Sequence, residues 1–250
     1  MASSYRQRST TYDMSGAKKA LMLCAMTAKQ GGESDMQIMR CFFSQFGFGG
    51  YGTNIIPNAS AMQMRENIQR FRNNIMRDQQ HISCIMVSVS CHGSVDELAG
   101  VDANRIKVSE IIEPFSDDNC PRLKGIPKIF ILDACRGDVE DEGVHRYSPQ
   151  QMDTNMKILR YRTNYAPPVI NDMFTVYPAM LGYATFGTDK GGFLHLSIQE
   201  VFQKEWPRNR GNHLDDLFLE VKKKFQAMHN RHPPVVVALV ESTLRKLIYL

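Results

Sequence analysis

Two residues whose side chains can act as nucleophile and acid–base partner, His92 and Cys135, each follow an apolar run of the sequence. A cysteine thiolate can attack a carbonyl carbon while an imidazole protonates the leaving amine. Gly93 leaves its backbone N–H open to a ligand, and together with the N–H of Cys135 it would form an oxyanion hole. Taken singly, such a cysteine is usually a buried apolar side chain, so the pairing of the two residues carries the prediction.

The elements that must position this pair are predicted from hydrophobic periodicity. Strands alternate with helices along the first part of the chain, with strands at residues 18–26, 53–57, 82–93 and 128–137 and helices at residues 34–48, 58–75 and 107–115. Ser34 or Asp35 can cap the first of these helices. The alternation predicts an α/β protein with a parallel sheet and helices on both faces. Because sites in such sheets form beyond the carboxyl ends of the strands, His92 and Cys135 should meet if their strands are neighbours.

The second part of the chain begins after a polar, initially acidic connector. It contains further predicted strands at residues 173–180 and 233–243 and helices at residues 194–206 and 213–228. The last strand is strongly apolar, and an apolar strand at the edge of a sheet needs a partner.

Composition narrows the class of protein. The 250 residues have 43% hydrophobic and 22% charged residues and a net charge of +4, which is ordinary for a globular domain and gives no basic patch for nucleic acid. No run approaches the roughly 18 apolar residues of a membrane span. The six cysteines form no CxxC pair, and the histidines lack metal spacing. We therefore expect a reduced, cytoplasmic protein without metal or cofactor.

The stretches SCHGS at residues 90–94 and DACRGD at residues 133–138 together resemble the caspase family. In that family the cysteine lies in a Q-A-C-[RQG]-G motif with the histidine about 50 residues upstream. The stretches DDNCPRLKGIPKIFI, VYPAMLGYATF and ESTLRKLIYL extend the resemblance, which covers residues 12–250.

The resemblance implies a three-layer fold with a six-stranded, mostly parallel sheet. It also implies four segments, which are a short N-terminal segment at residues 1–11, a large-subunit-like half at 12–138, an intersubunit linker at 139–168 and a small-subunit-like half at 169–250. The family takes part in apoptosis signalling and joins two such units through the last strand, so the implied partner is a second copy or a caspase paralogue.

Caspases mature when the linker is cut after aspartate, and the resemblance makes three residues available for such a cut: Asp138, Asp141 and Asp153. Each of them can equally be a solvated surface acid.

The residues that would bind a substrate aspartate differ from the family pattern. Caspases hold this carboxylate with two arginines and the glutamine of the cysteine motif. Lys29 stands in place of the first arginine and lacks its planar bidentate fork. Asp133 stands in place of the glutamine, and Gly187 in place of the second arginine, although Phe186 keeps an aromatic residue before it. Along a strand, residues 133 and 135 point the same way, so the Asp133 carboxylate should share a pocket with the thiol.

These changes have an estimable cost for a substrate that carries aspartate. Loss of one charge-assisted pair costs about 1.5–3 kcal/mol. Repulsion by Asp133 at about 4 Å adds about 4 kcal/mol at an effective dielectric constant near 20, partly offset by Lys29. A net 4 kcal/mol corresponds to roughly a thousandfold in kcat/KM. Asp133 could instead form an ion pair with Lys29 that plugs the pocket.

Three hypotheses follow. The chain can be a catalytically impaired decoy that regulates an active caspase paralogue. It can be an active cysteine endopeptidase that uses His92 and Cys135 with a basic residue before the scissile bond, although Lys29 would compete for Asp133. It can also retain residual cleavage after aspartate.

Overall fold

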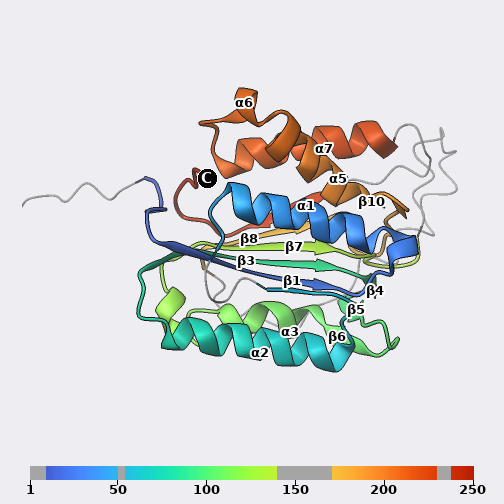
Figure 1. The fold of residues 1–250 in the computed structure, drawn as a ribbon, viewed down its shortest axis with the longest axis horizontal. Helices are drawn as coiled ribbons and strands as arrows, with labels where there is room; N and C mark the ends of the chain where they lie inside the picture. Colours follow the sequence, from blue (N-terminus) through green and yellow to red (C-terminus); the bar gives the residue numbers. More distant parts are fainter. Residues whose placement is uncertain (1–9, 50–53, 140–170, 230–237) are drawn as a thin grey trace, which may run out of the picture.

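A central sheet of six strands organises the chain (Figure 1). The computed structural model describes residues 10–49, 54–139, 171–229 and 238–250. The strands lie in the order β11-β8-β7-β3-β1-β2. Their bounds are β1 (Ala17–Cys24), β2 (Asn54–Ile56), β3 (Ile82–Ser90), β7 (Lys128–Asp133), β8 (Met173–Tyr177) and β11 (Leu239–Ser242). Only β11 runs antiparallel to its neighbour. The predicted α/β class with a six-stranded, mostly parallel sheet is confirmed.

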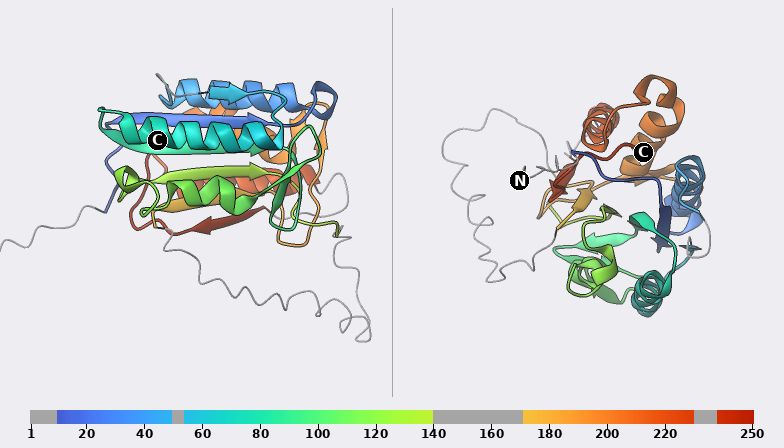
Figure 2. Two further views of the ribbon diagram at one scale, coloured as in Figure 1. Left: turned by 90° about the horizontal axis from the view of Figure 1, so that it is seen from below. Right: turned by 90° about the vertical axis from the view of Figure 1, so that its left-hand side faces the viewer.

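Helices cover both faces of this sheet, which makes three layers (Figures 1 and 2). The α-helices are α1 (Gly32–Gln45), α2 (Ala61–Arg77), α3 (Val108–Ile112), α5 (Phe193–Gln199), α6 (Trp206–Asn209) and α7 (Leu214–His229). A π-helical segment (Glu200–Lys204) follows α5, and short 3-10 turns lie at Ala28–Gln30, Glu113–Phe115 and Pro121–Leu123. No helix of the described part is long and apolar enough to cross a membrane.

Alternating side chains of the strands pack into two separate hydrophobic cores, one on each face of the sheet. In β1, Met22 and Cys24 pack on the side of α1, α5 and α7, whereas Leu21 and Leu23 pack on the side of α2 and α3. Successive side chains of a strand point to opposite faces, so continuous apolar runs are expected where both faces are covered.

The register of β3 and β7 decides where the two candidate reactive residues lie. The strands are parallel neighbours, with Ser90 opposite Asp133 at their carboxyl ends. The pairing continues one step further, because the N–H of Cys91 donates to the carbonyl of Asp133 over 3.2 Å. His92 and Cys135 therefore leave adjacent strands at the same edge of the sheet, as the sequence predicted.

Two small sheets at this end of the molecule were not predicted. One contains β4 (His92–Ser94), β5 (Glu97–Ala99) and β6 (Arg105–Lys107), and the other pairs β9 (Gly187–Thr188) with β10 (Gly191–Gly192). Strands of two or three residues are too short to show an alternating pattern. The first sheet places His92 at the start of a strand.

The start of α1 also differs from the prediction. The helix begins at Gly32, and its N-cap is Gly31, not Ser34 or Asp35. Asp35 lies within the first turn and is buried. Of the predicted strand at residues 233–243, the structure describes the end, where β11 lies; residues 230–237 are outside the described part.

Candidate active site

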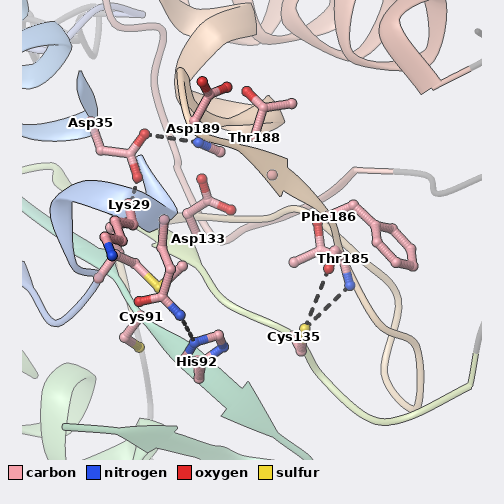
Figure 3. Close-up of a pocket in the computed structure, with 15 residues that line it drawn as sticks. Lys29, Asp35, Cys91, His92, Asp133, Cys135, Thr185, Phe186, Thr188 and Asp189 are labelled. Carbon is pink, nitrogen blue, oxygen red and sulfur yellow. Dashed lines mark hydrogen bonds between the residues drawn. The ribbon is translucent and has the colours of Figure 1, made fainter. Parts of the chain in front are cut away.

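A cavity of about 360 Å³ lies beyond the carboxyl ends of β1, β3 and β7 (Figure 3). The structure brings together in it six residues that the sequence singled out. They are Lys29, His92, Asp133, Cys135, Phe186 and Gly187. The loop that carries Phe186 and Gly187 comes from the second half of the chain, so the cavity lies between the two halves.

His92 is exposed, and its ring contacts a glutamine amide. Nε2 of Gln30 lies 2.8 Å from Nε2 of His92. The carbonyl oxygen of the same amide accepts from Thr27, so the amide nitrogen faces the imidazole and donates to it. This ring nitrogen of His92 is therefore an acceptor.

The thiol of Cys135 lies on the opposite wall and contacts the backbone of Thr185. Its sulfur is 3.4 Å from the Thr185 nitrogen and 3.5 Å from the Thr185 oxygen. Figure 3 shows the imidazole and the thiol held by different partners, and no hydrogen bond joins them in the described part of the chain. The expected contact between the two side chains is thus not seen, although both line the same cavity. Catalytic hydrogen bonds often form only when a substrate binds.

Gly93 packs directly against the backbone of Cys135. A Cβ atom at this position would lie 2.4 Å from the Cys135 carbonyl oxygen. A side chain at residue 93 would therefore push the cysteine loop away, so glycine is required for the two loops to approach this closely.

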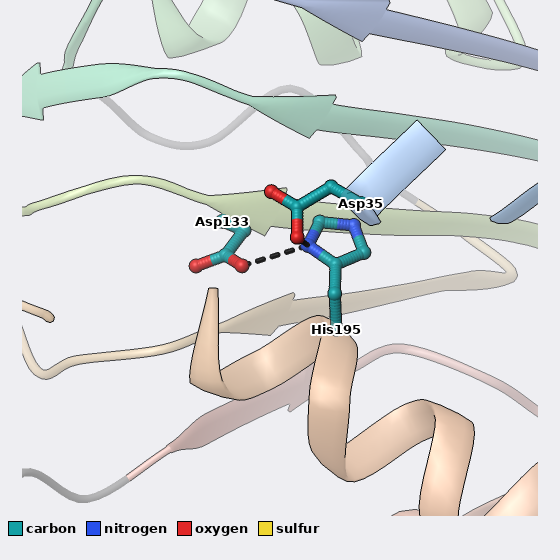
Figure 4. A group of neighbouring side chains, drawn as sticks. All are labelled: Asp35, Asp133 and His195. Carbon is teal, nitrogen blue, oxygen red and sulfur yellow. Dashed lines mark hydrogen bonds and ion pairs between the residues drawn. The ribbon is translucent and has the colours of Figure 1, made fainter. Parts of the chain in front are cut away.

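The base of the cavity is acidic, with Asp35 and Asp133 beside each other and the exposed Asp189 at the rim. Asp133 is only 6% exposed and pairs with His195 of α5, whose Nδ1 lies 2.7 Å from Oδ2 (Figure 4). The ion pair of Asp133 with Lys29 considered from the sequence is wrong, because a buried histidine takes that place. Lys29 is exposed and has no ion-pair partner among the described residues.

The imidazole of His195 is fully buried and bonded at both nitrogens. Nε2 lies 3.3 Å from the hydroxyl of Ser88, and Nδ1 faces both carboxylates. Burial alone would lower the pKa of His195, but the charge of Asp35 and the hydrogen bond and charge of Asp133 outweigh it and raise the pKa above its ordinary value. The structure thus favours the imidazolium form between two acids.

Asp35 completes this network from the first turn of α1. Its Oδ2 accepts from the Ser90 hydroxyl over 2.6 Å, and its Oδ1 accepts from the Gly192 N–H over 2.9 Å. Burial raises the pKa of Asp35, although the charge of His195 and these hydrogen bonds counteract it. The carboxylate therefore ties the β10 backbone to β3.

Sequence reasoning missed His195 and misassigned Asp35. The histidine is a lone polar residue in the apolar stretch FLHLSI, and such a residue is buried with a partner that spacing alone does not reveal. The one signal available was the unexpected acid at residue 133, because a buried carboxylate requires a partner.

Among the described residues, one group of side chains comes close enough to share a metal ion. The donor atoms of Asp35, Asp133 and His195 lie within 4.8 Å of one another. Two ligands of one tetrahedral zinc ion lie about 3.3 Å apart, given bonds of about 2.0 Å. The 2.7 Å between Nδ1 of His195 and Oδ2 of Asp133 is a hydrogen-bond distance, so this group is arranged to hold a proton.

Of the three aspartates expected in a linker, one lies in the described part of the chain. Asp138 is exposed and follows the cysteine loop. Its neighbour Val139 pairs with Tyr183 of the loop that lines the cavity. Asp141 and Asp153 lie outside the described residues.

Comparison with known proteins agrees with this architecture. The family model of the caspase domain matches residues 17–249. Human Caspase-14 is 28% identical over 96% of this chain and 95% of its own length, and Caspase-2 of Gallus gallus is 26% identical over 82% of this chain and 48% of its own length. The crystal structure of Caspase-1 from Spodoptera frugiperda superposes with a TM-score of 0.76 at 20% identity, covering 97% of this chain and 96% of that one. The chain belongs to the caspase family.

Proposed function

We propose that this chain is a caspase-fold protein that does not cleave after aspartate and acts as a regulatory partner of an active caspase in apoptosis signalling. The observation that carries the proposal is the acidic floor of the cavity. Asp35 and Asp133 lie there, where the carboxylate of a substrate aspartate would bind. The buried His195 pairs with Asp133 and neutralises part of this negative charge, whereas Lys29 lies at the exposed rim of the cavity.

The carboxylates at the floor of the cavity disfavour binding of an aspartate ligand even when His195 is protonated. Three carboxylates line the cavity, and the positive groups near them are one lysine and the buried imidazole of His195. A fourth carboxylate at about 4 Å from Asp133 would be repelled by about 4 kcal/mol at an effective dielectric constant near 20, before the offset from His195 and Lys29. A repulsion of this size lowers kcat/KM roughly a thousandfold.

The rest of the caspase domain supports association with another chain. The antiparallel strand β11 forms one edge of the six-stranded sheet. The N–H of Thr243 donates to Met173 of β8, so by alternation the N–H groups of Val240 and Ser242 point to the open side. Among the described residues no strand covers this side of β11, and such an edge can pair with the equivalent strand of a second copy or a paralogue.

Mixing experiments test the regulatory proposal. The purified chain is added to an active caspase from the same organism, and both the mass of the mixture and the caspase activity are followed. We expect a heterodimer and a changed activity that saturates with added chain. Absence of association at micromolar concentrations would overturn the proposal.

A second candidate is a cysteine endopeptidase that accepts a residue other than aspartate. Its support is that Cys135 and His92 line one solvent-accessible cavity at the ends of adjacent strands. Lys29 no longer argues against it, because Asp133 pairs with His195. Cys135-dependent turnover of any peptide, absent in Cys135→Ala, would select this candidate.

The division of the chain is also proposed from the family. Residues 12–138 and 169–250 would form the large and small halves, with residues 139–168 as the linker. Asp138 is the one described candidate for cleavage, and it is exposed. Mass spectrometry of the recombinant chain would detect a cut after this residue.

A further inference from the structure

One carboxylate oxygen of Asp133 is left for a ligand. Its Oδ2 is bonded to His195, and no donor to Oδ1 is found among the described residues. Oδ1 is not one of the fully buried unpaired atoms, so it is accessible from the cavity. The residue is 6% exposed and lines the cavity. Since Oδ1 can be reached from the cavity, it can accept a charge-assisted hydrogen bond from a cationic ligand.

Several neighbouring residues accommodate and support this carboxylate. A Cβ atom at Gly192 would lie 2.2 Å from Oδ2 of Asp133, and one at Gly191 would lie 2.6 Å from Oδ1 of Asp35. The two glycines therefore make room for the two acids. His195 and the hydroxyl of Ser90 then hold the acids in place. Support from four elements, β3, β7, β10 and α5, is typical of a maintained binding site.

We propose that this cavity binds the basic side chain, lysine or arginine, of a peptide. Asp133 would form the ion pair with this side chain, and His195 would position Asp133. The inference rests on the proposed function in one respect, namely that aspartate is not the ligand. It concerns binding only, so it holds whether or not the bound peptide is cut.

The charges of the cavity favour a basic ligand over a neutral one. Asp35, Asp133 and Asp189 face Lys29 and His195, which leaves an excess of acid when all are ionised. Lys29 is exposed, so its ammonium group can remain in water while a ligand enters. The volume of about 360 Å³ lies within the range of roughly 300–1,000 Å³ that ligand pockets have.

The test measures binding without turnover, in the Cys135→Ala chain. Fluorescence anisotropy compares labelled peptides that differ only in the last residue, which is arginine, lysine, glutamine or aspartate. One charge-assisted bond predicts that the arginine peptide binds about 10- to 100-fold tighter than the glutamine peptide, and the aspartate peptide weakest. Asp133→Asn should reduce the arginine preference to less than about threefold. The matched control Asp138→Asn, which changes an exposed acid outside the cavity lining, should leave it unchanged.

His195 is tested by two substitutions on the same background. His195→Asn keeps a donor near Oδ2 of Asp133, whereas His195→Leu removes it. Both substitutions remove the same positive charge, so the arginine preference should be larger in His195→Asn than in His195→Leu because only the first keeps a donor to position Asp133. A purely structural residue would lower thermal stability without this difference in selectivity.

Equal affinity for the arginine and glutamine peptides, preference for aspartate, or no binding of the arginine peptide at millimolar concentration would each overturn the inference. None of these results bears on whether the chain associates with an active caspase, which the mixing experiment decides separately.

Discussion

Nδ1 of His195 lies 2.7 Å from Oδ2 of Asp133, and both side chains are buried (Figure 4). Asp133 ends β7 in the first half of the chain, and His195 lies in α5 of the second half, 62 positions later. The pair thus joins the two halves directly beneath the cavity. It also explains how an acid can occupy this position without pairing with Lys29.

Removal of His195 should destabilise the fold strongly. His195→Leu leaves two buried carboxylates without their cation, and breaking a buried pair costs about 3–5 kcal/mol in the free energy of unfolding. Urea denaturation followed by circular dichroism measures this change. His81→Asn, which alters an exposed histidine, should change stability by less than about 0.5 kcal/mol. A loss below about 1 kcal/mol for His195→Leu would show that the pair contributes little.

The same pair predicts how stability depends on pH. The raised pKa of His195 means that the folded chain binds this proton more tightly than the unfolded chain does. Its contribution is therefore complete below about pH 6.5 and is lost as the pH rises through the raised pKa. The raised pKa of Asp35 acts in the same direction.

The stability difference between the wild type and His195→Asn should accordingly shrink as the pH rises above about 6.5. Denaturant titrations at several pH values on both proteins measure it. A difference that grows with pH contradicts the assignment of a proton to this pair.

Gly93 is predicted to control the position of Cys135. In Gly93→Ala the new Cβ would lie 2.4 Å from the Cys135 carbonyl oxygen, so the cysteine loop must move. We expect a loss of about 1–3 kcal/mol in stability and an altered rate of thiol alkylation by iodoacetamide. Gly49→Ala is the matched control, because nothing lies within 4 Å of a Cβ there. Equal alkylation rates in the two variants would refute the close approach of these loops.

The open edge of β11 predicts how the chain associates. Ser242→Pro removes an N–H that points away from β8 and should therefore block pairing with another chain while sparing the bonds to β8. Light scattering should show a smaller mass for this variant than for Ser242→Ala at the same concentration. Dimers that persist in the proline variant would place the interface elsewhere.

Hydrophobic periodicity predicted a parallel sheet, the family resemblance implied its six strands, and alternation along the strand placed Asp133 on the same side as Cys135. The expected meeting of His92 with Cys135 is not seen, because each side chain is held by a different partner. The sequence did not predict His195 as the partner of Asp133, since that contact joins a strand end to a helix 62 positions away. Asp35 was misassigned because a carboxylate near a helix start is also typical of a cap. The two small sheets escaped prediction because two- and three-residue strands carry no pattern.

Turnover of fluorogenic aspartyl peptides shows whether this cavity accepts aspartate. The chain is assayed both intact and after treatment with a protease that cuts within residues 139–168, the proposed linker, with Cys135→Ala as control. We predict no turnover above that control. A Cys135-dependent kcat/KM of about 10⁴ M⁻¹s⁻¹ or more, within the range of ordinary enzymes, would contradict the account.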